Sequence, residues 1–371
     1  MSKSSTYIHS FVEAMYNKEQ AYNSLPVLPP TIDIETKAIL KQAITANKVL
    51  AELKGRADEI PNQSMLVNAI TLQEAKDSSE IENIVTTQDS LYKAFSSNIS
   101  ATDVQTKEVL RYRQALWDGF NSLKERPLST NTIIKIVQTI KENNAGIRNT
   151  PGTRIMSANE VIYTPPEGEQ LIRELLYNLE NFIHDDKGID DLVKLAVMHY
   201  QFEAIHPFFD GNGRTGRVLN ILYLVDKQLL DTPILYLSKY IIENKNEYYQ
   251  KIRSVTENND WEAWILFMLK GVEDTAKYTL QKINTINELM DETVRYAKAN
   301  LPSRVYSKEL IELLFVQPYA KVKFLVDNNI AKRQTAAEYL QELEKIGVLK
   351  SQKVGVENLF LNVKLFEILK N

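Results

Sequence analysis

One short stretch of the chain brings together residue types that bind and transform phosphate groups. Residues 206–217 read His-Pro-Phe-Phe-Asp-Gly-Asn-Gly-Arg-Thr-Gly-Arg, which combines an imidazole, a carboxylate, a glycine-rich turn and two guanidiniums. The residues on either side, 192–200 and 218–225, are apolar in runs typical of buried helices. The stretch is therefore predicted to be a loop that joins two buried helices.

The second half of this loop has the features of an anion-binding site. The backbone N–H groups of Gly211, Asn212 and Gly213 are expected where the second helix begins, at the positive end of its dipole. The two glycines allow positive φ angles and a close approach of a ligand to the backbone. Arg214 and Arg217 are three residues apart, so they share one helical face, where two planar guanidiniums can hold neighbouring phosphates.

Two other side chains would add chemistry to a bound phosphate chain. Asp210 offers a hard oxygen ligand, which suits a Mg²⁺ ion that takes most of its ligands from phosphates and water. His206 can accept a proton near neutral pH. Together these residues predict a nucleotide polyphosphate site with its own base. The alternative is an ordinary helix N-terminus in a glycine-rich loop.

The order of residues in this loop resembles the signature of the Fic family, His-Pro-Phe-x-(Asp/Glu)-Gly-Asn-Gly-Arg-x-x-Arg, and every specified position is filled. The resemblance implies an all-α fold, a helical bundle with a short β-hairpin flap. It implies a protein adenylyltransferase that moves AMP from ATP to Ser, Thr or Tyr hydroxyls of target proteins and of itself. Some Fic proteins transfer UMP, phosphate or phosphocholine, or remove AMP, and these activities are alternatives.

The same resemblance assigns roles to individual residues. His206 is expected to be the catalytic base, and Asp210 the Mg²⁺ ligand. Nucleotide contacts are expected from Glu160, Val161, Ile162, Tyr163, Gly211, Asn212, Gly213, Arg214, Thr215, Gly216, Arg217, Tyr248 and Tyr249. The last two would border the adenine, although paired tyrosines at a helix surface are usually core or rim residues.

A segment upstream of the loop predicts regulation. Ser78 and Glu82 are four residues apart and therefore lie on one helical face. Residues 78–83 also resemble the inhibitory motif of the family, (Ser/Thr)-x-x-x-Glu-(Gly/Asn), with Asn83 at its last position. The resemblance implies that Glu82 pairs with Arg217 and inhibits the enzyme. The alternative is a polar helix end with solvated side chains.

A change of pattern precedes the central loop. Residues 152–166 are rich in β-formers and turn residues, and they predict a short hairpin that turns near residues 157–159. The position of this hairpin and its terminal Pro165-Pro166 match the flap of the Fic fold. An isolated hairpin exposes strand edges. The resemblance implies that a target segment pairs with one of these edges.

The composition narrows the classes of protein that fit. With 371 residues the chain is long enough for two or three domains, and a net charge of −4 argues against a nucleic-acid or membrane surface for the chain as a whole. The absence of cysteine excludes disulfides, thiolate metal sites and a cysteine nucleophile. The first twenty residues lack an apolar signal-peptide core, and no later run approaches a membrane span, so a cytoplasmic protein without membrane contact is expected.

The periodicity divides the chain into three parts. Helices are expected at residues 33–53, 62–79, 103–120, 129–143 and 261–299. The last of these ends before Leu301-Pro302, which marks a domain boundary. We therefore predict an N-terminal helical region with the inhibitory motif (1–102), a Fic catalytic domain (103–300) and a third domain (303–371).

The third domain reads as a winged helix-turn-helix. Three short helices are expected at 307–315, 320–328 and 332–346, followed by a hairpin that turns at Gly355. The third helix begins with Lys332-Arg333-Gln334-Thr335, where a DNA reader places base contacts, but it continues with acidic residues, Glu338, Glu342 and Glu344, that phosphates would repel. Protein recognition or a homodimer contact is the alternative role. A function of another class is a DNA-binding regulator whose Fic domain senses nucleotide.

Overall fold

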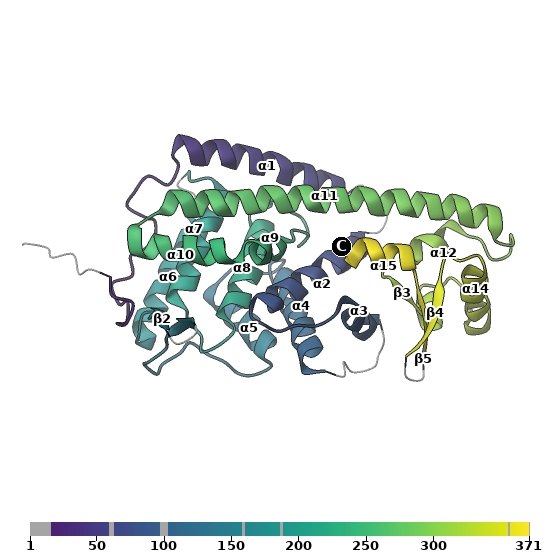
Figure 1. Cartoon of the computed structure of the whole chain (residues 1–371), viewed down its shortest axis with the longest axis horizontal. Helices are drawn as coiled ribbons and strands as arrows, with labels where there is room; N and C mark the ends of the chain where they lie inside the picture. Colours follow the sequence, from purple (N-terminus) through teal and green to yellow (C-terminus); the bar gives the residue numbers. More distant parts are fainter. Residues whose placement is uncertain are drawn as a thin grey trace, which may run out of the picture.

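The computed structural model describes residues 16–58, 63–96, 103–157, 160–185, 188–354 and 357–370. Its long axis follows α11 (Trp261–Asn300), a helix of 40 residues that links a larger helical part to a smaller part containing a sheet (Figure 1). The expected helix at 261–299 is thus confirmed. The predominance of helices also confirms the all-α class predicted from the sequence.

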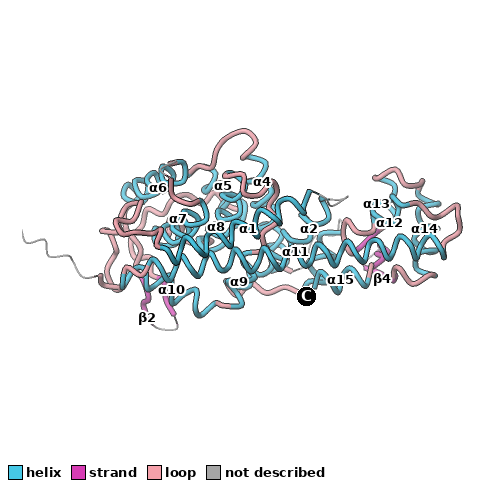
Figure 2. Tube along the Cα trace, turned by 90° about the horizontal axis from the view of Figure 1, so that it is seen from above, coloured by secondary structure: helices cyan, strands magenta, loops and turns pink. Residues whose placement is uncertain are grey.

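The larger part consists of ten helices in the described residues. They are α1 (Lys37–Asp58), α2 (Gln63–Ile81), α3 (Gln88–Ser96), α4 (Val104–Ser122), α5 (Thr130–Lys141), α6 (Glu169–His184), α7 (Asp191–Ile205), α8 (Asn212–Asp226), α9 (Leu237–Glu243) and α10 (Lys245–Asn258). Helix α1 lies alongside α11 in both views (Figures 1 and 2). Nearly every residue of α7 and α8 is buried, as the apolar runs predicted, so these two helices occupy the centre.

Local signals in the sequence account for several helix starts. Asp103, Ser129 and Asp190 cap α4, α5 and α7 by accepting hydrogen bonds from backbone N–H groups of the first turn. The expected helices at 103–120 and 129–143 correspond to α4 and α5. The first expected helix, 33–53, corresponds to α1, but both of its bounds differ from the prediction: α1 starts at Lys37 and continues to Asp58.

An extended segment precedes α1 and covers two helices. Leu25 and Leu28 are buried, and the backbone of Leu28 exchanges hydrogen bonds of 2.7 and 3.0 Å with the side-chain amide of Asn178 on α6. The side chain of Gln201 on α7 donates to the carbonyl of Pro26 at 2.9 Å. Residues 25–28 are thereby fixed against α6 and α7.

The expected hairpin at 152–166 is present. Strands β1 (Ile155–Ser157) and β2 (Glu160–Tyr163) are antiparallel, with Met156 opposite Val161. The predicted turn includes residues 158 and 159, which lie outside the described residues. Figure 2 shows this hairpin at the opposite end of the molecule from the second sheet.

The smaller part follows the expected order of three helices and a hairpin. It comprises α12 (Lys308–Leu313), β3 (Tyr319–Ala320), α13 (Val322–Asp327), α14 (Arg333–Lys345), β4 (Lys350–Val354), β5 (Glu357–Leu361) and α15 (Val363–Lys370). The antiparallel sheet has the order β3-β5-β4. One expected boundary was wrong: Ala320 pairs with Phe360 in the sheet, so α13 starts only at Val322. The turn predicted at Gly355 lies outside the described residues.

The smaller part also contacts the helix that carries the predicted inhibitory motif. The side-chain amide of Gln73 on α2 donates to the carbonyl of Leu369 on α15, and Lys282 on α11 donates to Gln73 Oε1 at 3.1 Å. Tyr92 on α3 packs edge-on against Phe366 with 6.1 Å between the ring centres. Helix α15 therefore contacts α2 through Gln73, within the same helix that carries Ser78. Within the described residues, no helix combines the length and hydropathy of a membrane span.

Candidate active site

The central loop begins where α7 ends and closes where α8 begins. His206 terminates α7 in the left-handed region (φ 49°, ψ 58°), and Gly211 precedes α8 at φ 84°. The buried side chain of Asn212 spans the loop: it accepts from the Phe208 N–H at 2.9 Å and donates to the Phe208 carbonyl at 2.7 Å. The Asn212 side chain thus closes the loop through both backbone groups of Phe208.

The protonation state of His206 suits a base. Burial is the main influence on the imidazole and, together with the positive charge of Arg148, lowers its pKa to about 4. The carbonyl of Glu203 and the carboxylates of Glu82 and Asp210 act in the opposite direction without reversing the shift. The ring is therefore neutral at pH 7 and able to accept a proton.

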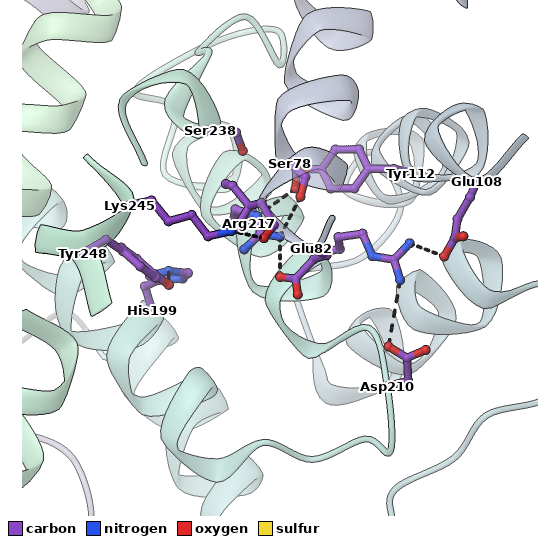
Figure 3. Close-up of polar contacts among 12 residues, drawn as sticks. Ser78, Glu82, Glu108, Tyr112, His199, Asp210, Arg217, Ser238, Lys245 and Tyr248 are labelled. Atoms are coloured by element: carbon purple, nitrogen blue, oxygen red, sulfur yellow. Dashed lines mark hydrogen bonds and ion pairs between the residues drawn. The ribbon is translucent and has the colours of Figure 1, made fainter. Parts of the chain in front are cut away.

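Arg217 on α8 is held by the end of α2 (Figure 3). Its side chain is 3% exposed, and its Nη2 atom donates to Glu82 Oε1 at 2.9 Å. Nε donates to Ser78 Oγ at 2.8 Å, and Nη2 also donates to the Ser78 carbonyl at 2.9 Å. Burial alone would raise the pKa of the Glu82 carboxyl, but the guanidinium outweighs it and holds that pKa below its ordinary value.

The carboxylate of Glu82 lies directly over the start of α8. A Cβ atom added at Gly213 would overlap Glu82 Oε1 and would lie 3.0 Å from Arg217 Nη1. Only glycine leaves room for a negative group this close to the backbone. The start of α8, where the sequence predicted an anion site, therefore already faces one anion, which belongs to the protein itself.

The end of α2 is shaped so that Glu82 reaches this position. Asn83 adopts a left-handed conformation (φ 62°), which asparagine tolerates better than most residues, and it turns the chain after the helix. Lys245 on α10 donates to the Ile81 carbonyl at 2.7 Å and fixes the last turn from the other side. Ser78 and Glu82 are thus brought together with Arg217, and Asn83 shapes the turn that follows them without a hydrogen bond to the arginine. Lys245 carries no sequence signal for its role.

A second buried residue fastens α2 near the same arginine. Glu74 is buried and accepts hydrogen bonds from Tyr112 Oη at 2.9 Å and from the backbone and hydroxyl of Ser238 at 2.9 and 2.5 Å. Burial raises the pKa of its carboxyl to about 7, against these hydrogen bonds and the charge of Arg217. Neither Glu74 nor Tyr112 was identified from the sequence, because their partners lie far away in the chain.

Arg214 and Asp210 are also engaged by neighbouring side chains. Arg214 is buried and donates to Glu108 Oε1 at 2.6 Å, while its Nη2 lies 4.0 Å from Asp210. Asp210 is 65% exposed and accepts from Lys141 Nζ at 2.5 Å. These acidic and basic side chains form an alternating row beside the loop.

The predicted Mg²⁺ ligand can be tested against this arrangement. Among the described residues, no group of three or more acidic or histidine side chains forms a metal cage. Asp210 offers one exposed carboxylate, and Mg²⁺ bound with a nucleotide commonly takes only one or two protein carboxylates. The donor set therefore fits the ion only together with substrate phosphates, after Lys141 has released Asp210.

The other residues predicted to contact the nucleotide range from fully buried to exposed. Thr215 is buried, and a Cβ atom at Gly216 would lie 2.5 Å from Glu203 Oε1, so α8 packs closely against α7 at Gly216. Tyr248 is buried and its hydroxyl meets His199 Nε2 at 2.8 Å, whereas Tyr249 is 42% exposed. Burial lowers the pKa of His199 to about 3, which agrees with a structural role for that histidine.

The flap residues divide between surface and core. Glu160 is exposed and forms an ion pair with Lys18, and Ile162 is partly buried. Val161 and Tyr163 point inwards, and the Tyr163 hydroxyl donates to the Ala204 carbonyl at 2.8 Å. This hydrogen bond ties the flap to α7 just before His206.

Comparison with known proteins agrees with this geometry. The family model described as the Fic/DOC family matches residues 127–224, and that of the Fic/DOC family N-terminal region matches residues 40–121. A third model, the C-terminal domain of protein adenylyltransferase SoFic-like proteins, matches residues 289–365. Together these models span the central loop, the helix with the predicted inhibitory motif and most of the smaller part.

Two curated relatives carry the same description of activity. A probable protein adenylyltransferase of Aquifex aeolicus is 26% identical over 211 residues, which are 56% of this chain and 58% of that protein. Protein adenylyltransferase fic-1 of Caenorhabditis elegans is 26% identical over 125 residues, which are 33% of this chain and 23% of that protein. The match therefore spans just over half of the first relative and about a quarter of the second.

Solved structures share the fold at low sequence identity. A Fic family protein from Desulfovibrio desulfuricans G20 has a TM-score of 0.59 and 16% identity, over 90% of this chain and 98% of that one. Residues 134–508 of Fic-1 from C. elegans give a TM-score of 0.51 and 18% identity, over 67% and 73% of the two chains. The family models and the relatives agree with the filled signature at residues 206–217, and the chain carries a Fic/DOC domain.

Proposed function

We propose that this chain is a protein adenylyltransferase, which transfers AMP from ATP to a hydroxyl group of a target protein. The observation that carries the proposal is the position of a neutral imidazole, His206, in the loop that leads to the N-terminus of α8, whose first turns carry Arg214 and Arg217. The names of the curated relatives, both described as protein adenylyltransferases, support the same activity.

The proposed reaction uses the loop as follows. The hydroxyl oxygen of a target Ser, Thr or Tyr attacks the α-phosphorus of ATP while His206 takes the hydroxyl proton. The bond between the α-phosphorus and the oxygen that bridges to the β-phosphorus breaks, and pyrophosphate leaves. Arg214 and Arg217 hold the β- and γ-phosphates, and the N–H groups of residues 211–213 stabilise the developing charge. Asp210 would hold a bound Mg²⁺, which supplies further positive charge beside the phosphates.

We also propose that Glu82 inhibits this reaction. Its carboxylate occupies Arg217 and lies over Gly213, where the proposed site would receive the far end of the triphosphate. A negative group at this position competes with ATP for the arginine and repels its phosphates. The alternative role for the same carboxylate is to orient a water molecule that removes AMP from a modified target.

The flap supplies a surface for the target. On the β2 side, the Tyr22 N–H donates to the Thr164 carbonyl at 3.0 Å, and Lys18 pairs with Glu160. The outer edge of β1 has no strand partner within the described part of the chain. We therefore propose that the target segment pairs, as an added strand, with the outer edge of β1. This pairing would hold the hydroxyl group of the target at a fixed position along the flap.

Labelled ATP distinguishes the proposed activity from its alternatives. With Mg²⁺ and ATP labelled at the α-phosphate, the protein or a lysate target should become labelled, and His206→Ala should abolish the label. ATP labelled at the γ-phosphate should leave no label, because pyrophosphate departs. Label from γ-labelled ATP, or from UTP in preference to ATP, would replace adenylyl transfer with phosphate or UMP transfer. A gel shift that resists heparin would favour the DNA-binding regulator.

A further inference from the structure

A buried arginine outside the signature contacts the end of the catalytic helix. Arg148, in the segment between α5 and β1, is 1% exposed. Its Nε donates to the His206 carbonyl at 2.7 Å, and Nη2 donates to the Ile205 carbonyl at 3.2 Å. Nη2 also donates to the Pro166 carbonyl at the end of the flap, and the Arg148 backbone N–H donates to the Pro207 carbonyl at 2.9 Å.

The partners of this arginine are backbone carbonyls rather than carboxylates. Within the described residues no acidic side chain forms an ion pair with Arg148, and burial lowers the pKa of its guanidinium. The negative charge of Glu167 acts on Arg148 in the opposite direction without reversing this shift, so the buried cation depends mainly on its hydrogen bonds. Here the last carbonyls of α7, which lie at the negative end of the helix dipole and lack partners within the helix, receive its hydrogen bonds.

These contacts constrain the residue proposed as the base. His206 is in the left-handed region, which is uncommon for a residue with a side chain. The Arg148 hydrogen bond to the His206 carbonyl fixes the orientation of the peptide plane that follows this residue. The Pro166 contact joins the same guanidinium to the segment that follows β2, so one side chain contacts both the residue proposed as the base and the end of the flap.

We propose that Arg148 is a positioning residue for His206, one that fixes the left-handed backbone of this residue and thereby the direction in which its imidazole projects. The proposal rests on the proposed function only in so far as His206 is the base of adenylyl transfer. The contacts themselves predict effects on the imidazole that can be measured without any transfer.

The first test follows the titration of His206 directly. Arg148→Met removes the positive charge and the carbonyl contacts, so the pKa of His206 should rise by roughly half a unit to one unit. The groups that also face this imidazole, namely Glu82, Asp210 and the Glu203 carbonyl, stay unchanged. Histidine ring signals in an NMR titration provide the readout, with His206→Ala for assignment. The matched control is Arg173→Met, which removes an exposed arginine of α6.

The second test follows the rate of transfer in a Glu82→Ala background. Arg148→Met should lower the rate at saturating ATP by at least tenfold, leave the Kd for ATP within about threefold and shift the acid limb of the pH profile upwards. Arg148→Lys keeps the charge but makes fewer hydrogen bonds, so the rate should fall while the acid limb stays in place. If Arg148→Met does not fold, Arg148→Lys decides.

The outcomes separate the two proposals. A rate within threefold of the parent and an unmoved His206 titration would overturn the role of Arg148. If the parent protein transfers no AMP, the proposed function fails, while the NMR titration still reports on Arg148. A loss of ATP binding in Arg148→Lys would also overturn the proposal, because a positioning residue for the base should spare the phosphate site.

Discussion

Replacing Glu82 with alanine should activate the protein. The substitution removes the carboxylate that pairs with Arg217 at 2.9 Å and leaves the two Ser78 contacts of the arginine in place. Arg217 then keeps its position but loses its anionic partner. ATP no longer has to displace that partner or approach a negative charge over Gly213, so both binding and transfer should improve.

The size of the effect follows from the exposure of the pair. A hydrogen bond between charged groups contributes about 1.5–3 kcal/mol when both are desolvated. The Glu82 side chain is 37% exposed, so solvent screening weakens its interaction with Arg217. We therefore take about 1–2 kcal/mol as the free energy of this interaction. This corresponds to an increase of roughly 5- to 30-fold in the fraction of protein that can bind ATP productively.

The assay is the initial rate of self-labelling with α-labelled ATP over a range of ATP concentrations. Because Glu82 competes for a phosphate-binding arginine, the gain should be largest at low ATP. Glu80→Ala is the matched control, since Glu80 pairs with Lys76 at 2.7 Å and makes no contact with Arg217. The control should stay within twofold of wild type. Equal rates for Glu82→Ala and wild type at every ATP concentration would refute the reasoning.

Three further predictions concern the base, its titration and the support of α2. His206→Ala in the activated protein should reduce transfer by roughly 10²–10⁴ while the Kd for ATP stays within a few-fold; a loss below tenfold would exclude its role as base. Because the base acts only when deprotonated and the pKa of His206 is lowered to about 4, kcat/KM should be flat near neutral pH and fall only as pH drops towards that value. An acid limb at the ordinary histidine pKa would contradict this assignment. Gln73→Ala should raise wild-type self-labelling severalfold, because it detaches α2 from Leu369 and Lys282; hydrogen exchange in α2 that matches wild type would count against this link.

The central features of the fold were predictable because their signals are local. The apolar runs on either side of the loop predicted α7 and α8, and turn residues with β-formers predicted the flap. Ser78 and Glu82 share a helical face, which four-residue spacing alone reveals. These patterns depend on neighbours within one or two turns of the chain.

Other features depend on partners that are distant in sequence. Strand β3 has only two residues, and its partner β5 lies some forty residues later. Arg148 is a single arginine in a loop, with its carbonyl partners 57 and 58 residues away. Lys141 and Asp210 form an ion pair although they are 69 residues apart in the sequence, and no pattern in the residues around either of them predicts this contact. Such contacts become visible only when the helices are packed.

Helix α11 has a consequence for how targets could be chosen. Its 40 residues span about 60 Å as one unbroken helix, and it belongs to both parts of the molecule. A flexible linker would let a bound partner search many positions, but a continuous helix that is packed along its length holds the two parts at a set separation. A target that bound to the smaller part would therefore approach His206 from a distance that the length of α11 sets, and that distance would limit which hydroxyl groups could reach the base.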